Sequence, residues 1–226
     1  MYIKNPKICF SYRLFFLILC GFSIISHFSL TDEYNNEKMF SFFTIQSTIF
    51  CFIVFLPFTV IAYKKIKDKV IFASFNKWIL LKEMATHAIL ITFLSYRYVL
   101  RGKGFSMYSI QETSLFFKDI SIHFILPILV FLDYLLFQEK GLFHFRDCLY
   151  NLIFPFFYLF FLCIRNLSHN SNDFLYVPKY PYFFLDIEAF GIKKVLSFIF
   201  VYFALILLLG ILIVFADHLF AKAQKT

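Results

Sequence analysis

The sequence predicts an all-α integral membrane protein, a helical bundle with six transmembrane helices. Of its 226 residues, 61% are hydrophobic and 37 are phenylalanine, and the mean hydropathy is +0.75. Soluble chains contain about half apolar residues, so no ordinary soluble core would absorb this excess. Several apolar stretches reach the roughly 20 residues that cross a bilayer as a helix. They are continuously apolar and lack the alternation of a membrane β-barrel.

Six spans are expected, and no internal repeat or linker divides residues 1–226, so they form a single domain. The first follows a basic N-terminus and lacks a small-residue cleavage site, so we expect it to remain as a helix. The second lies between the acidic stretch TDEYNNEK and the basic stretch YKKIKDK, and the fifth is short and aromatic. The expected spans are approximately Phe10–Leu30, Met39–Tyr63, Trp78–Val99, Asp119–Phe137, Leu149–Cys163 and Val195–Leu219.

The distribution of charge predicts the orientation of the chain. Six spans place both termini on one side together with the second and fourth loops, and that side carries most of the Lys and Arg residues. By the positive-inside rule both termini are cytoplasmic. The net charge of +8 is explained by this topology and by anionic headgroups. Because no basic stripe is interleaved with exposed aromatics, no nucleic-acid partner is expected.

Neither a cofactor nor a metal ion is expected from the sequence. The five cysteines lack CxxC spacing and are interpreted as buried small hydrophobes rather than a disulfide set or a metal site. Glu83 and His87 stand four residues apart and could be two metal ligands. However, KEMATH is not HExxH and no third ligand is evident, so a helix-stabilising or interhelical polar pair is favoured.

Polar side chains inside apolar spans are functional hypotheses, because hydrocarbon disfavours them. The stretch FSFFTIQSTIF contains Thr44, and DISIHFILPILVFLDYLLF contains His123. These residues stand five and four positions into two parallel spans. At about 1.5 Å per residue, both lie roughly 6–8 Å from the same boundary. His27, near the end of the first span, is interpreted as interfacial.

Thr44 and His123 together predict ester chemistry. A threonine hydroxyl becomes a nucleophile when a base removes its proton, and burial favours the neutral imidazole that such a base requires. Asp119 shares a helix face with His123 and could orient its ring. Gln46 and Ser47 could stabilise an oxyanion. The alternative is structural, since membrane Ser and Thr side chains commonly bond to helix carbonyls and a membrane His often makes an interhelical bond.

The loop NDFLYVPKYPYFFLDIEAFG, before the last span, is expected on the same side as Thr44 and His123. Its prolines and aromatics predict an ordered cap at the membrane interface. Tyr180, Pro181 and Asp186 are therefore candidates for a loop that covers a lipid entrance. An ordinary aromatic belt is the alternative.

Three segments in this order resemble the androgen-induced membrane protein family and its bacterial six-span relatives. They are FFTIQS, HFILPILVFLDYLLF and YPYFFLDIEAFG. The resemblance implies an intramembrane threonine hydrolase that cleaves esters of fatty acids with hydroxy fatty acids, with both termini in the cytoplasm. The family's Thr and His fall on Thr44 and His123. The LDYLL ending resembles the bacterial branch, which implies the cell membrane of a bacterium.

Three functions therefore stand as hypotheses. The first is an intramembrane lipid-ester hydrolase whose partner is a membrane lipid or lipid-ester substrate. The second is a non-catalytic membrane protein that binds or moves a lipid or small apolar ligand. The third is an ion or proton pathway through Glu83, His87 and His123, against which stands the lack of an inverted repeat or broken helices.

Overall fold

The computed structural model describes residues 3–67, 76–100, 113–168 and 178–223. Within these ranges the regular structure is entirely helical, which confirms the predicted all-α class. Six helices are long and apolar enough to cross a membrane, as the hydropathy predicted. These spans are Pro6–His27, Phe43–Ile66, Lys77–Leu100, Phe117–Phe137, Phe145–Ser168 and Ile192–Ala223.

Several spans are built from more than one helical element. In chain order the α-helices are α1 (Pro6–His27), α2 (Glu33–Phe40), α3 (Phe43–Ile66), α4 (Asn76–Ser95), α5 (Thr113–Ile120), α6 (Leu126–Phe137), α7 (Ile153–Ser168), α8 (Ile187–Phe190) and α9 (Ile192–Ala223). The other elements are two π-helical segments, η1 (Tyr96–Leu100) and η2 (Ser121–Ile125), and two 3₁₀ helices, η3 (Phe145–Leu152) and η5 (Phe183–Leu185).

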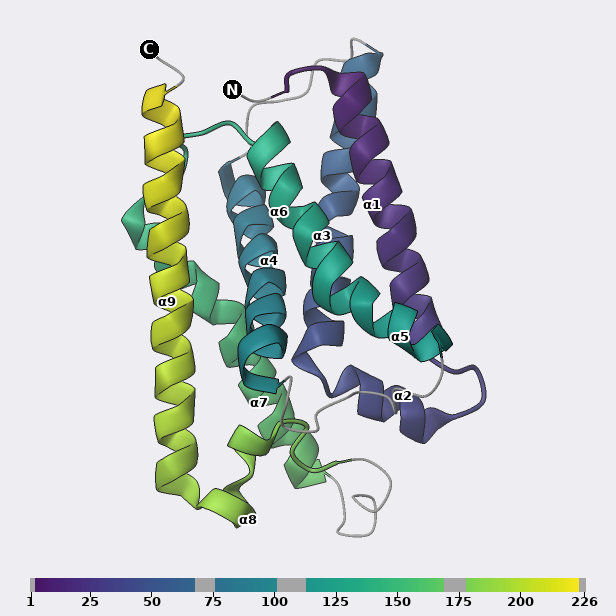
Figure 1. The fold of residues 1–226 in the computed structure, drawn as a ribbon, viewed down its shortest axis with the longest axis vertical. Coiled ribbons are helices and arrows are strands. Elements are labelled where there is room, and N and C mark those ends of the chain that lie inside the picture. The colour runs from purple at the N-terminus through teal and green to yellow at the C-terminus, as the bar shows by residue number, and fades with distance from the viewer. Residues whose placement is uncertain (1–2, 68–75, 101–112, 169–177, 224–226) are drawn as a thin grey trace.

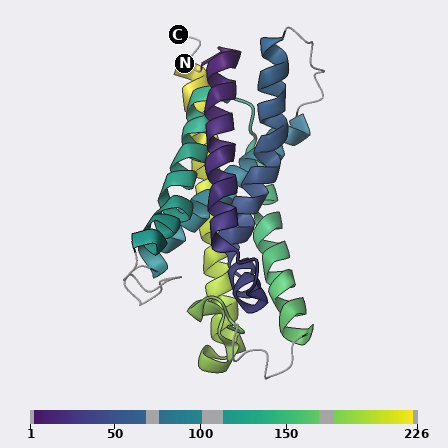
Figure 2. The same ribbon diagram turned by 90° about the vertical axis from the view of Figure 1, so that its right-hand side faces the viewer.

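The long helices lie side by side, and both chain ends are at the same end of the bundle (Figure 1). The short helices α2 and α8 lie at the opposite end, where α3 and α5 also begin. The view turned by 90° shows α1 packed along α6 on one side and α3 on the other (Figure 2). The starts of the second and fourth spans therefore share one end of the bundle.

The second span starts later than its hydropathy predicted. Asp32 caps α2, which ends at Phe40, and Phe42 is extended before α3 begins at Phe43. The Gln46 amide donates to the carbonyl of Phe40 at 2.9 Å across this break. Thr44 is thus the second residue of α3, rather than five residues into a continuous helix.

Helix η2 interrupts the fourth span with a π-helical turn that carries His123. The N–H of Leu126 bonds to the carbonyl of Ser121, five residues earlier. Pro127 follows, and because proline has no N–H it cannot continue the i to i−4 ladder. The change from i−4 to i−5 backbone hydrogen bonds lies directly before this proline. Pro127 is therefore a residue from which the irregular segment could be recognised in the sequence. Such π-bulges occur frequently at functional sites.

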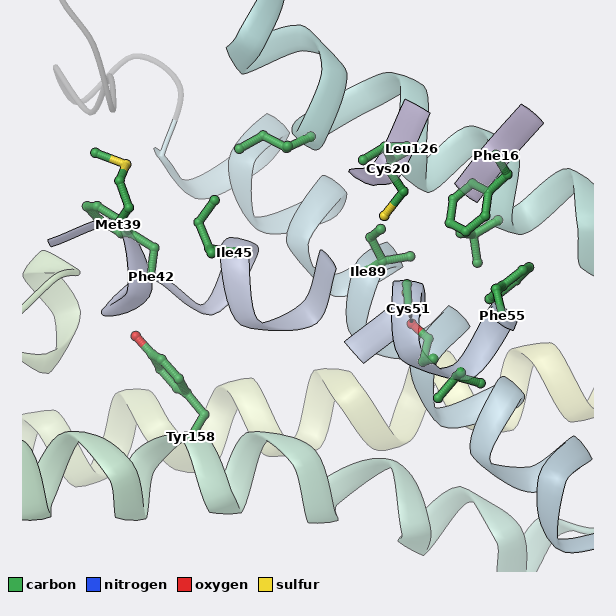
Figure 3. Close-up of a cluster of buried hydrophobic side chains, with 14 of the residues drawn as sticks. Phe16, Cys20, Met39, Phe42, Ile45, Cys51, Phe55, Ile89, Leu126 and Tyr158 are labelled. Carbon is green, nitrogen blue, oxygen red and sulfur yellow. Dashed lines mark hydrogen bonds between the residues drawn. The ribbon is translucent and has the colours of Figure 1, made fainter. Parts of the chain in front are cut away.

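The main core lies between α1, α3, α4 and α6, with further residues from α7 and the segment around η5, and is made of buried aliphatic, aromatic and sulfur-containing side chains (Figure 3). Phe16 and Phe55 meet with ring centroids 4.7 Å apart. Tyr158 of α7 reaches across the core and donates to the carbonyl of Ser41 at 3.0 Å, which secures the break between α2 and α3.

The cysteines follow the predicted pattern in part. All five thiols are free, and Cys20, Cys51 and Cys148 are buried, whereas Cys9 is half-buried. Cys163 is exposed, which corrects its interpretation as a buried hydrophobe. The reason is that α7 packs on one face only, so its outer face lies on the surface of the bundle.

Asp217 joins α9 to the turn after α6. Its buried carboxylate accepts from the N–H groups of Gly141 at 2.7 Å and Leu142 at 3.1 Å and from the Tyr134 hydroxyl at 3.2 Å. Gly141 has φ = 81°, a conformation that glycine adopts without strain. One buried carboxylate therefore accepts from a buried tyrosine and from backbone N–H groups of the turn.

Asp217→Ala is expected to destabilise the protein, because the donors of the buried residues Tyr134 and Phe143 lose their acceptor and each buried donor left unsatisfied costs about 1–3 kcal/mol. Thermal unfolding of the purified protein measures the loss. The control is Asp32→Ala, which removes an exposed helix cap worth typically ~1 kcal/mol. Equal losses in the two variants would contradict this role of Asp217.

Candidate functional site

Thr44 lies on the wall of a cleft at the end of the bundle opposite the termini. Its side chain is 4% exposed and contacts the hydroxyl of Tyr182 through a hydrogen bond. The cleft is formed by α3, α4, η1, α7, α9 and the segment around η5. It holds about 650 Å³ of space free of atoms, its open mouth included.

The lining of the cleft is apolar with a few hydroxyl groups. The hydroxyls belong to Thr44, Thr92, Ser95, Tyr158, Tyr182 and Tyr202. Among the described residues, every other lining side chain is aliphatic, aromatic or proline, and none carries a charge. This composition suits a long apolar molecule with a small neutral polar group.

Tyr182 is one of the cleft residues that sequence reasoning missed. Its ring is 6% exposed and stacks on Phe184 at a centroid distance of 5.3 Å. Burial raises the pKa of Tyr182 to about 12, and the contact with Thr44 acts in the opposite direction. The phenol is therefore neutral at physiological pH and can donate a hydrogen bond. In the sequence, the only indication of Tyr182 was its position in YPYF, directly after Tyr180 and Pro181.

The remaining polar side chains near Thr44 have structural partners. Ser47 bonds to the Thr44 carbonyl at 3.0 Å and to the Thr92 hydroxyl at 3.1 Å, which joins α3 to α4. Thr48 also donates to the Thr44 carbonyl, at 2.8 Å. The side chains of Gln46 and Ser47 therefore use their hydrogen bonds within the protein, and neither residue lines the cleft.

His123 is buried in η2, with 1% of its surface exposed. Its ring lies against Tyr96 of η1 with centroids 3.9 Å apart. Asp119 Oδ1 is 3.8 Å from His123 Nε2, so the two residues share a helix face as predicted, at a distance longer than a hydrogen bond. The Tyr96 hydroxyl donates to the other oxygen of Asp119. Two π-helical segments therefore meet at this imidazole.

Thr44 and His123 are not joined by a hydrogen bond. Neither ring nitrogen of His123 has a hydrogen-bond partner among the described residues. The segment η2 packs against both α3 and α4, so the imidazole lies on a neighbour of the helix that carries Thr44. Catalytic hydrogen bonds are often long or poorly aligned without substrate.

His27 joins the surroundings of His123 from α1. It is 2% exposed and its Nδ1 lies 2.6 Å from the carbonyl of Ser23. The hydroxyls of Ser23 and Ser121 share a hydrogen bond, which holds α1 to η2. His27 is therefore packed in the protein interior near the end of its span.

The loop that was predicted to cover a lipid entrance is described only in part, because its residues 172–177 lie outside the described ranges. Some of its described residues line the cleft, and others stabilise the fold. Pro181 is buried and Tyr180 is half-buried, whereas Asp186 caps α8 by accepting from the Ala189 N–H at 2.9 Å. Arg165 bonds to Glu37 at 2.9 Å and to the carbonyl of Pro178 at 3.1 Å, which ties this segment to α2 and α7.

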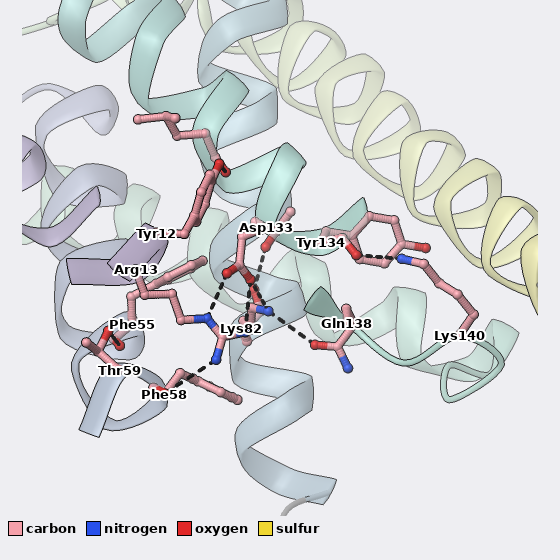
Figure 4. Close-up of polar contacts among 12 residues, drawn as sticks. Tyr12, Arg13, Phe55, Phe58, Thr59, Lys82, Asp133, Tyr134, Gln138 and Lys140 are labelled. Carbon is pink, nitrogen blue, oxygen red and sulfur yellow. Dashed lines mark hydrogen bonds and ion pairs between the residues drawn. The ribbon is translucent and has the colours of Figure 1, made fainter. Parts of the chain in front are cut away.

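A second polar centre, which the sequence did not predict, lies deep in the bundle toward the termini (Figure 4). Asp133 is fully buried and accepts from Arg13 at 2.7 Å and 3.3 Å, and it forms an ion pair with Lys82. Lys82 also donates to Gln138 at 3.2 Å, and Arg13 donates to the Phe58 carbonyl at 3.3 Å. This triad of Arg13, Lys82 and Asp133 joins the first, third and fourth spans.

Comparison of the chain with family models, curated proteins and solved structures finds no match. In the described residues, no group of three or more His, Cys, Asp and Glu side chains is arranged to hold a metal ion. The geometry itself therefore carries the functional argument. It offers a hydroxyl and a neutral phenol at an apolar cleft, with a buried imidazole on an adjacent helix.

Proposed function

We propose that the protein is an intramembrane hydrolase of neutral lipid esters, with Thr44 as nucleophile and His123 as general base. The observation that carries this proposal is the position of the Thr44 hydroxyl on the wall of an uncharged apolar cleft, against the phenol of Tyr182. An acyl chain in the cleft would place its ester beside Thr44. The resemblance to the androgen-induced membrane protein family supports the same pair.

In the proposed reaction, Thr44 Oγ attacks the ester carbonyl and its proton passes to a ring nitrogen of His123. The tetrahedral intermediate collapses to an acyl-threonine, and the alcohol leaves with the proton from His123. Water, deprotonated by the same imidazole, then releases the fatty acid and restores Thr44. The step requires the side chains of α3 and η2 to approach once the ester is bound.

The uncharged lining favours a neutral substrate. Burying a carboxylate or phosphate without a partner is costly, and no charged side chain is among the described residues of the cleft. The ester and its acyl chain would enter the cleft from the bilayer. A charged end of a larger substrate would have to stay outside.

The proposed setting is a bacterial cell membrane with both termini in the cytoplasm. The described parts of the termini lie at the same end of the bundle, together with Lys64 and Lys65 at the end of α3, whereas residues 68–69 of the basic stretch are not described. The cleft would then be near the outer surface.

Thr44→Ala is expected to abolish labelling of the purified protein by a fluorophosphonate probe, because the alanine has no nucleophilic oxygen. Thr48→Ala is the matched control, since Thr48 is buried one turn further along α3 and its hydroxyl donates to the Thr44 carbonyl. The control should label like wild type. Labelling that survives Thr44→Ala would remove Thr44 as the nucleophile.

A second candidate function is non-catalytic binding of a neutral lipid. The bond between Thr44 and Tyr182, and the absence of a bond from His123 among the described residues, favour it. A fluorescent long-chain ester distinguishes the two functions. Stoichiometric binding without release of free acid would support binding alone, whereas repeated turnover that requires Thr44 would support hydrolysis.

A further inference from the structure

Three neighbouring buried side chains each carry a polar atom that has no hydrogen-bond partner among the described residues. They are Glu83 Oε2, His87 Nδ1 and Asn151 Oδ1. Their residues are 6%, 1% and 4% exposed. Glu83 and His87 stand one turn apart on α4, and Asn151 comes from η3. Together these residues form a cluster that is separate from the cleft and from the triad at Asp133.

All three atoms are hydrogen-bond acceptors. His87 Nε2 lies 2.9 Å from the carbonyl of Ile206, which can only accept, so Nε2 carries the hydrogen and Nδ1 of the neutral ring is a bare lone pair. Asn151 uses Nδ2 to donate to Glu83 Oε1 at 3.0 Å, which identifies its other atom as the carbonyl oxygen. The three free atoms are therefore all acceptors, and the donor that remains in the cluster is the second N–H of the Asn151 amide, on the nitrogen that already bonds to Glu83.

Such a cluster lacks a donor for its three free acceptors among the described residues. An ionised carboxylate inside a membrane span requires a counter-charge or several donors, and Glu83 has one donor, the Asn151 amide. His87 Nδ1 is 3.9 Å from Glu83 Oε1, close enough for a small movement to bring the two residues into a direct bond. A single proton would neutralise the site and supply the missing donor.

The packing around the cluster preserves this arrangement. A Cβ at Gly210 would lie 3.1 Å from Asn151 Nδ2 and 3.2 Å from Cys148, so the glycine allows η3 to approach α9 closely. Ile206, which binds His87, also lines the cleft. The residue that binds His87 is therefore itself part of the cleft wall, so the cluster lies directly behind that wall.

We propose that Glu83, His87 and Asn151 form a proton-binding site that holds one exchangeable proton between the carboxylate and the imidazole. The proton is either on Glu83, as a neutral acid that donates to His87 Nδ1, or on His87, as an imidazolium paired with Glu83. Both forms have zero net charge. A transition-metal ion is the competing occupant, but the site would offer it only one carboxylate, one imidazole and one amide.

Other ionisable groups also face Glu83. Asp147 and Cys148 come from η3, and Tyr134 comes from α6. Lys82, the neighbour on α4, is bonded instead to Asp133 and Gln138. From α9, the Ile206 carbonyl bonds to His87, and Gly210 packs against Asn151. Glu83 Oε2 has no hydrogen-bond donor among the described residues.

Infrared spectroscopy of the purified protein at neutral pH tests for the proton. A protonated carboxyl band that shifts in D₂O and is lost in Glu83→Gln would locate the proton on Glu83. If that band is missing, ¹⁵N spectra of histidine-labelled protein should show His87 protonated on both nitrogens, with the signal assigned through His87→Gln. Glu37→Gln is the matched control, because Glu37 is ion-paired with Arg165 and should not contribute the band.

An ionised Glu83 beside a neutral His87 at neutral pH would overturn the proposal. So would a stoichiometric metal ion that is present in the wild type and lost in Glu83→Gln. If Glu83→Gln does not fold, ¹³C labelling of glutamate in the wild type reports the same carboxyl through its titration. These measurements use no ester, so their outcome is independent of the proposed hydrolysis.

Discussion

Asp133→Leu is expected to destabilise the protein by about 3–5 kcal/mol, the usual cost of removing one partner from a buried ion pair. Arg13 and Lys82 would remain as two buried cations without a carboxylate, and both are less than 9% exposed. Their contacts with the Phe58 carbonyl and with Gln138 offset only part of this charge. Since whole domains are stable by about 5–15 kcal/mol, most of the variant should be unfolded or aggregated when extracted.

The triad also provides matched controls, because it contains two positive charges and one negative charge. Lys82→Met leaves Arg13 and Asp133 as a one-to-one pair that retains its bonds of 2.7 Å and 3.3 Å. Its loss of stability should be clearly smaller than that of Asp133→Leu. Replacing Arg13 and Lys82 with Met together with Asp133→Leu should recover much of the loss, since an apolar core replaces the charges.

Thermal unfolding in one detergent, with the yield of monodisperse protein, measures all of these variants. Equal losses for Lys82→Met and Asp133→Leu would show that the cluster acts through packing alone. A triple variant as unstable as Asp133→Leu would contradict the argument that the uncompensated cations cause the damage.

The fold could be predicted from the sequence because hydropathy is a local property of each span. The six spans recur in the structure with ends shifted by a few residues. The exact start of the second span could not be read in the same way, because its apolar run begins at Met39 whereas the helix breaks at Ser41 and Phe42. That break depends on Tyr158, which lies more than a hundred positions away along the chain.

The candidate site could be predicted only where its contacts are local. Asp119 and His123 share a face of one helix, so their spacing indicated their proximity. The contact between Thr44 and Tyr182 and the pairing of Arg13 with Asp133 join distant segments, which no spacing rule describes. The role of Pro127 was accessible in principle, since a proline inside a span indicates an irregular helix.

His123→Ala is expected to lower ester turnover by two to four orders of magnitude, the usual contribution of a general base, about 10²–10⁴-fold. Thr44 would keep its cleft and its contact with Tyr182, so binding of a neutral ester should change little. The loss should appear in kcat rather than in KM. Added imidazole should restore part of the rate, because the removed ring leaves a space at the site where the base is needed.

Tyr96→Phe is the matched control for this experiment. It keeps the ring that packs on His123 at 3.9 Å and removes only the hydroxyl that donates to Asp119. Its turnover should stay much closer to wild type, because no atom that transfers a proton is lost. If Thr44→Ala abolishes turnover but His123→Ala does not, a different group deprotonates Thr44. The Tyr182 oxygen, already bonded to Thr44, would then be the residue to test, since the imidazole would have only a packing role.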